Sequence, residues 1–153
     1  MAANVEAGAG YLVKRVQQSL RRNCDAALRD AGLSMAQYTV LRALADHPQA
    51  SAAELARLCF VTRQSLQDVL SGLRADALVE ESSGPQRGRA RALQLTLAGK
   101  RRLSGAHAAV LRVEQDMLTG IPGKARRELA SLLLRCAENL EAASAETTVD
   151  GCR

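Results

Sequence analysis

Apolar residues recur every three or four positions along most of the chain, which is the spacing of helices that bury one side. The first such stripe consists of Leu12, Val16, Leu20, Cys24, Ala27, Leu28 and Ala31. Gly32 follows the stripe, and glycine is common just past the end of a helix because it adopts a positive φ without strain. The pattern therefore predicts a long N-terminal helix over about residues 10–31.

Three residues that cap helices well stand before the next apolar repeats. Ser34 opens one helix, and Ser51 forms a capping-box pattern with Glu54 three residues later. Thr62 opens another, directly after the apolar turn 59–61. Two helices joined by such a turn predict a helix-turn-helix, whose second helix can enter the DNA major groove. A plain helical hairpin has the same pattern.

Residues 77–82 and 91–96 show the alternating pattern of β-strands, and they flank a tip rich in Gly, Pro and Arg. This arrangement predicts a β-hairpin, and a basic hairpin directly after a helix-turn-helix is a wing. Thr96 can then cap a long helix that the Gly-Ile-Pro-Gly segment at 120–123 ends.

A final helix is predicted over about residues 124–143, and residues 144–153 are predicted to form a tail without regular structure. The chain has 153 residues, of which 47% are hydrophobic and 2% aromatic, so we expect a single domain over residues 1–153. Its core must come from aliphatic helix formers, chiefly Ala and Leu. The predicted fold class is therefore mainly α, and a β-sandwich or barrel is excluded.

The positive charge is concentrated in the middle of the chain. The net charge is +5, and residues 51–112 hold ten Lys or Arg against five acids, so the flanking segments sum to zero. Between Ser82 and Val113 there are seven basic residues and no acid. This distribution favours a polyanion as the partner, although a solvated basic face would have the same composition.

No motif for catalysis, for a metal or for a membrane is found. The four cysteines, Cys24, Cys59, Cys136 and Cys152, form no CxxC pair, and the two histidines are far apart in sequence, so neither structural zinc nor another cofactor is expected. A nucleophile with a neighbouring base and a glycine-rich phosphate loop are both missing, so we predict no enzyme. No stretch approaches the roughly 18 apolar residues of a membrane span, and we expect a cytoplasmic protein without a membrane partner.

The runs GLSMAQYTVLRAL, AAELARLCFVTRQSLQDVLSGL, ALVEE and LTLAGKRRL, in this order and spacing, resemble the MarR family of winged-helix transcriptional regulators over about residues 10–143. The resemblance implies a winged helix-turn-helix at 34–96 with a small two-stranded β-wing. It also implies a homodimer held by helices within 10–31 and 97–143, and a palindromic site on double-stranded DNA.

The candidate DNA-binding residues of the second helix stand in its first turns. Arg63, Gln64 and Gln67 have side chains that suit guanine and adenine edges. Thr62 and Ser65 are expected to bond phosphate or to cap the helix, and the two roles are compatible.

On the wing, the resemblance places Arg89 at the family's minor-groove arginine, while Arg87 stands where the family has aspartate. We expect Arg87 and Arg91 to contact phosphate or to remain on a free surface. Two further departures from the family pattern are Asp68 on the second helix, which could repel phosphate or accept from a cytosine amine, and Ala77, where a glycine is usual.

The resemblance also implies a small effector, phenolic or carboxylated, that releases the DNA. Arg15, Gln18, Tyr38 and Arg42 are the candidate ligand-binding residues, with Arg15 pairing a carboxylate and Tyr38 stacking. The alternatives are a salt bridge for Arg15 and core packing for Tyr38. We therefore predict a ligand-responsive repressor; the alternatives are a cysteine-based redox sensor, with Cys59 in the turn, and a winged-helix module for protein partners.

Overall fold

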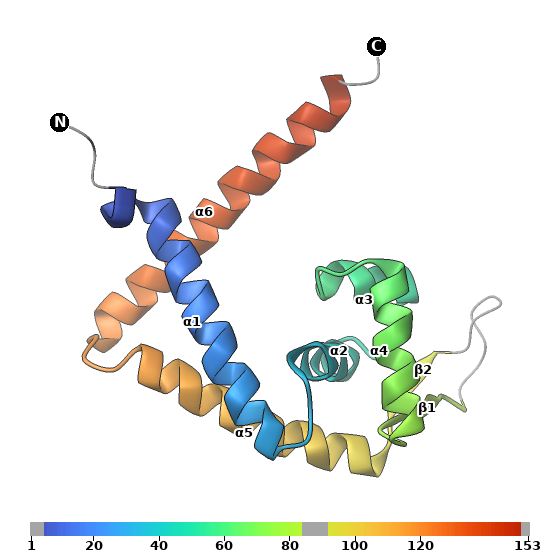
Figure 1. The fold of residues 1–153 in the computed structure, drawn as a ribbon. Coiled ribbons are helices and arrows are strands. Elements are labelled where there is room, and N and C mark those ends of the chain that lie inside the picture. The colour runs from blue at the N-terminus through green and yellow to red at the C-terminus, as the bar shows by residue number, and fades with distance from the viewer. Residues whose placement is uncertain (1–4, 84–91, 151–153) are drawn as a thin grey trace. The chain divides into compact units, whose positions relative to one another are not determined.

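The structure of this chain, a computed structural model, describes residues 5–83 and 92–150. Its elements follow in the order η1 (Val5–Ala7), α1 (Ala9–Asp30), α2 (Met35–Asp46), α3 (Ala52–Leu58), α4 (Arg63–Ala75), β1 (Val79–Glu81), β2 (Leu93–Leu95), α5 (Leu97–Met117) and α6 (Gly123–Asp150) (Figure 1). The contacts group the chain into two compact units, Met1–Gln115 and Asp116–Arg153, where the sequence indicated one domain. The second unit is essentially α6, and none of its described side chains is buried.

The predicted helix starts are confirmed by hydrogen bonds. The Ser34 hydroxyl accepts from the backbone amide of Gln37, whose side-chain oxygen accepts from the Ser34 amide at 3.0 Å. Ser51 and Glu54 form the same reciprocal pair at the start of α3. The Thr62 hydroxyl accepts from an amide in the first turn of α4. Each of these bonds satisfies a donor that the helix itself cannot.

Three helices end in turns of the same type, which we call left-handed turns. In each turn the second residue after the helix has a positive φ. These residues are Gly32 after α1 (68°), Phe60 after α3 (55°) and Ala77 after α4 (55°). In each turn the backbone amides of this residue and of the next one donate to carbonyls in the last turn of the helix. This conformation explains the glycine that the family pattern has at position 77, because only glycine adopts positive φ without strain.

The core of the first unit is aliphatic and draws on every helix from α1 to α5 and on the hairpin. Its buried members are Cys24, Leu28, Leu33, Tyr38, Val40, Leu41, Leu44, Leu55, Ala56, Cys59, Leu66, Leu70, Leu73, Leu78, Val79, Leu95, Leu103, Ala106 and Val110. Only the C-terminal half of the predicted α1 stripe takes part, since Leu12 and Val16 are exposed. The mainly α fold class with a two-stranded sheet is confirmed.

The hairpin pairs β1 with β2 in antiparallel register, with Val79 opposite Leu95 and Glu81 opposite Leu93. The amide of Ser82 donates to the carbonyl of Ala92, which extends the pairing by one step. The hairpin is predicted correctly by the alternation of apolar and polar residues.

Thr96 joins the end of α4 to the start of α5. Its hydroxyl donates to the Ala77 carbonyl at 2.7 Å and accepts from the Gly99 amide at 3.0 Å, while its own amide donates to the Leu78 carbonyl. Gly99 is buried against Leu78, and a Cβ at this position would overlap the Leu78 carbonyl oxygen. We call these four residues the α4–α5 junction.

The last helix is longer than predicted. The sequence indicated an end near Ala143 and a tail without regular structure from residue 144, whereas α6 continues to Asp150. No proline or glycine occurs between Lys124 and Asp150, so nothing in the backbone ends the helix earlier. No helix within the two described ranges is long and apolar enough to cross a membrane.

We predict that Gly99→Ala destabilises the protein by about 1 to 3 kcal/mol, because the methyl group meets backbone that cannot move aside. The matched control is Gly105→Ala in the same helix, where nothing lies within 4 Å of the added Cβ. That variant should gain about 0.5 to 1 kcal/mol from helix propensity. Urea unfolding of both variants gives the measurement, and equal midpoints would contradict the steric role of Gly99.

Candidate nucleic-acid interface

The first half of α4 presents a polar face and an apolar face that are cleanly separated. Leu66, Leu70 and Leu73 are buried at 0%, 1% and 0% exposure, at the spacing of one helical side. The predicted DNA-binding residues of this helix, Thr62, Arg63, Gln64, Ser65 and Gln67, are all exposed. The core therefore turns these polar side chains toward solvent, where a partner can reach them.

Thr62 and Ser65 carry out the capping role that the sequence allowed. The Thr62 hydroxyl accepts from the Ser65 amide at 3.1 Å and lies 3.0 Å from the Ser65 hydroxyl. The carboxylate-free N-terminus of α4 carries the positive end of the helix dipole, which attracts an anion such as phosphate. Both hydroxyls remain exposed while they cap the helix.

Asp68 is held by a neighbour on the same exposed face. The Gln64 side-chain amide donates to the Asp68 carboxylate at 3.2 Å, across one helical turn. Gln64 retains its second amide hydrogen and its carbonyl oxygen, the pair that an adenine edge requires. The sequence leaves the role of Asp68 open between repelling phosphate and accepting from a cytosine amine, and in the structure its carboxylate accepts from Gln64.

The predicted DNA-binding residues of the wing, Arg87, Arg89 and Arg91, lie outside the described residues. The strands that carry this tip are described, and Glu80 and Gln94 face one another across them with a 3.0 Å hydrogen bond.

Cys59 lies in the turn between α3 and α4 and is buried, at 8% exposure. Burial raises the pKa of the Cys59 thiol, and burial with the nearby Glu114 and Asp25 carboxylates raises the pKa of the Cys24 thiol. Both groups are therefore neutral thiols near pH 7, whereas the reactive form is the thiolate. This environment gives no support to Cys59 as a redox sensor.

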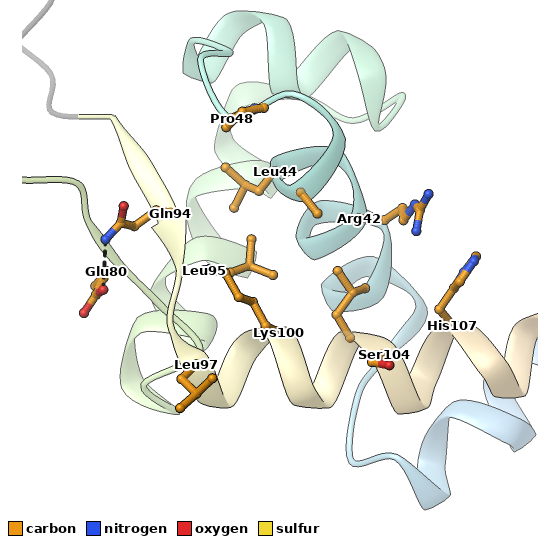
Figure 2. Close-up of a pocket in the computed structure, with 12 residues that line it drawn as sticks. Arg42, Leu44, Pro48, Glu80, Gln94, Leu95, Leu97, Lys100, Ser104 and His107 are labelled. Atoms are coloured by element: carbon orange, nitrogen blue, oxygen red, sulfur yellow. Dashed lines mark hydrogen bonds between the residues drawn. The ribbon is translucent and has the colours of Figure 1, made fainter. Parts of the chain in front are cut away.

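A cleft of about 700 Å³ opens between α2, the hairpin and α5. Figure 2 shows Arg42 and His107 at one end of the cleft and the bonded pair of Glu80 and Gln94 at the other, with Lys100 between them. Leucines line the wall, so the cleft combines apolar surface with basic groups. Lys100, one of the seven basic residues between Ser82 and Val113, lines this cleft.

Arg42 also lines a second cleft of about 240 Å³, together with Tyr38. Its guanidinium donates to the Asp46 carboxylate at 2.9 Å, one helical turn later. Half-exposed pairs of this kind are weak and can be exchanged for another carboxylate. Of the four predicted ligand residues, Arg42 and Tyr38 lie together, whereas Arg15 and Gln18 are exposed on α1 and line neither cleft.

Tyr38 is part of the hydrophobic core, which is the alternative to ligand binding that the sequence left open for it. Its hydroxyl lies 2.9 Å from His107 Nδ1, and the two rings stack with centroids 6.4 Å apart. Burial raises the pKa of Tyr38, so its hydroxyl stays protonated and can donate to the imidazole. Sequence reasoning missed His107, because 69 positions separate it from Tyr38 and no local pattern joins them.

The described residues contain no group of three or more His, Cys, Asp or Glu side chains that could hold a metal ion. The exposed face of α4 and the two clefts are thus the sites that the structure offers. The first offers exposed hydrogen-bonding side chains at a helix N-terminus, and the clefts offer apolar walls beside basic side chains.

Comparisons with known proteins agree with this geometry. The model of the MarR family matches residues 31–90. The HTH-type transcriptional repressor Rv2887 of Mycobacterium tuberculosis is 33% identical over 128 residues, which are 84% of this chain and 92% of that protein. Its crystal structure in complex with DNA superposes with a TM-score of 0.70 at 32% identity, covering 85% of this chain and 98% of that chain. The complex with salicylic acid gives 0.71 at 31% identity, covering 88% and 99%.

Proposed function

This chain belongs to the MarR family of DNA-binding transcriptional regulators, which are not enzymes, and on that premise we propose that it represses transcription as a ligand-released homodimer on a palindromic operator. The observation that carries the proposal is the exposed polar face at the start of α4, held outward by three buried leucines. A DNA-binding regulator without a membrane-spanning helix in its described residues is expected to meet its operator in the cytoplasm, so we place the activity there.

In this proposal the first turns of α4 enter the major groove. Arg63 reads guanine with its two-pronged guanidinium, and Gln64, oriented by Asp68, reads adenine. Gln67 lies one turn from Arg63 on the same exposed face and extends the reading to a further base. Thr62 and Ser65 bond phosphate from the helix start, and Arg87, Arg89 and Arg91 bind backbone and minor groove.

The homodimer is supported by apolar side chains that this protomer leaves exposed. On α6 these are Leu129, Leu132, Leu133, Cys136 and Leu140, which fall on one side of the helix. On α1 the N-terminal half of the stripe, Leu12 and Val16, is likewise exposed. Stripes of this length are covered in stable proteins, and a second copy of the chain supplies matching stripes.

The proposed effector is a small aromatic acid in the cleft between α2 and α5. Arg42 and Lys100 supply positive charge for the carboxylate, and leucines supply the apolar wall for the ring. The salicylic acid complex of the M. tuberculosis relative supports this chemistry. Such a ligand weakens DNA binding only if it binds the released form more tightly than the DNA-bound form.

We predict that Arg63→Ala weakens binding to the operator by about 10- to 100-fold, because a two-pronged contact to guanine contributes about 1 to 3 kcal/mol. Arg74→Ala is the matched control, since it removes the same charge from an exposed position near the other end of α4. Fluorescence anisotropy with a duplex selected from a random pool by the wild-type protein measures both. Equal losses in the two variants would contradict the docking of the α4 N-terminus.

We predict that Leu133→Glu turns the dimer into a monomer, because the substitution buries a charge in the proposed interface. Leu134→Glu changes a more exposed leucine of α6 that points away from the stripe, and it should leave the dimer intact. Sedimentation equilibrium distinguishes the two states. A dimer for the Leu133 variant, or a monomer for both, would contradict the stripe as the contact.

We predict that salicylate, used as a probe, binds the protein and that Arg42→Ala weakens this binding about tenfold through loss of a charged hydrogen bond. Asp46→Asn should have the opposite effect, a gain of about two- to fivefold, because it frees Arg42 from its carboxylate partner. Titration calorimetry measures all three proteins. Unchanged affinity in both variants would remove Arg42 from the effector site.

A further inference from the structure

The turn between α3 and α4 (Figure 1) contains Phe60, for which two features of this position are unfavourable. Its side chain is 93% exposed, the largest value among the large apolar residues of the described part of the chain. Its backbone has φ 55°, in the region that L-residues with bulky side chains rarely occupy. It is also the one phenylalanine of the sequence. Folding alone gives no reason for this residue at this position.

The other two left-handed turns show what the backbone requires. Gly32 and Ala77 occupy the equivalent position after α1 and α4, with the same pattern of backbone hydrogen bonds. The residue after this position enters the core in those turns, as Leu33 and Leu78 do, whereas the position itself faces outward. The turn is thus complete without a side chain, and the ring of Phe60 is available to a partner.

The surroundings of Phe60 indicate which partner. Arg57 and Arg63 stand three positions before and after Phe60, whereas the nearest acidic residues, Glu54 and Asp68, lie six and eight positions away and each accepts a hydrogen bond. Both arginines are exposed. Two residues after Phe60 the helix N-terminus of α4 begins at Thr62, where its capping hydroxyls face solvent. An apolar ring within a basic surface fits a partner that alternates negative charge with hydrocarbon.

We propose that Phe60 packs against the deoxyribose of the DNA backbone, at the edge of the groove that α4 enters. Deoxyribose presents C–H surface between phosphates, so the arginines and the helix N-terminus meet phosphate while the ring covers the sugar. This contact adds affinity without reading sequence, and it releases no counterion. The inference rests on the proposed function, because it assumes that this face of the protein binds DNA.

The test is Phe60→Gly. Loss of the ring should weaken binding about tenfold to the selected duplex and to a scrambled duplex of the same length, with an unchanged slope of log K against log salt. The same variant should raise Tm by about 2 to 4 °C, because glycine relieves the positive φ. A loss of affinity caused by a destabilised fold would come with a lower Tm, so opposite changes in Tm and in DNA affinity exclude that cause.

Two further variants serve as controls. Ala77→Gly relieves the same backbone conformation at the far end of α4, so its Tm should rise while its DNA affinity stays that of the wild type. Phe60→Leu keeps an apolar side chain and should retain most of the affinity that Phe60→Gly loses.

Three results would overturn the inference. The first is wild-type DNA affinity for Phe60→Gly. The second is a loss of affinity confined to the selected duplex, which would indicate a base contact. The third is a changed mass of the Phe60→Gly protein in sedimentation equilibrium, which would place the ring at a protein contact. Failure of the wild-type protein to bind either duplex would instead overturn the proposed function, so the two failures are distinguishable.

Discussion

The α4–α5 junction is the constraint on which the rest of the first unit depends. The Thr96 hydroxyl donates to the Ala77 carbonyl just after α4 and accepts from the Gly99 amide in the first turn of α5. Because Gly99 has no side chain, its backbone can lie directly against that of Leu78. The same contact fixes the base of the hairpin, because β1 begins at Val79 directly after the junction and β2 ends at Leu95 directly before it. Helix α4, the hairpin and the long helix α5 are therefore held together at one point.

This coupling gives the cleft between α2, the hairpin and α5 its importance. A ligand that changes the spacing of α2 and α5 acts on α5, which the junction links to α4. In the proposed function, release of DNA follows from such a shift, and it requires only that the two arrangements differ in ligand affinity. The contact of Arg102 with the Gly32 carbonyl, at 3.3 Å, extends the linkage from α5 to the turn between α1 and α2. Arg102, in the second turn of α5, thus has a structural role beside any part in binding DNA.

Much of the fold follows from local signals in the sequence. Ser34, Ser51 and Thr62 start their helices because their side chains satisfy amides three residues on, and alternation defines the hairpin. The features that could not be predicted are contacts between residues far apart in the sequence and backbone conformations of single residues. Tyr38 and His107 meet only through the packing of α2 with α5, and the strained position of Phe60 becomes visible only once φ is known. The end of α6 was misjudged because weak helix formers do not end a helix when no breaker follows.

The most direct measurement is a hydroxyl-radical footprint of the protein on the DNA upstream of its own gene. A dimer that places α4 of each protomer in successive major grooves should protect two symmetric windows about 10 base pairs apart, centred on a palindrome. Each window should be contracted in a variant that lacks the wing tip, while the spacing stays the same. A single asymmetric window, or protection without sequence preference, would contradict the assignment of this chain as a palindrome-reading repressor.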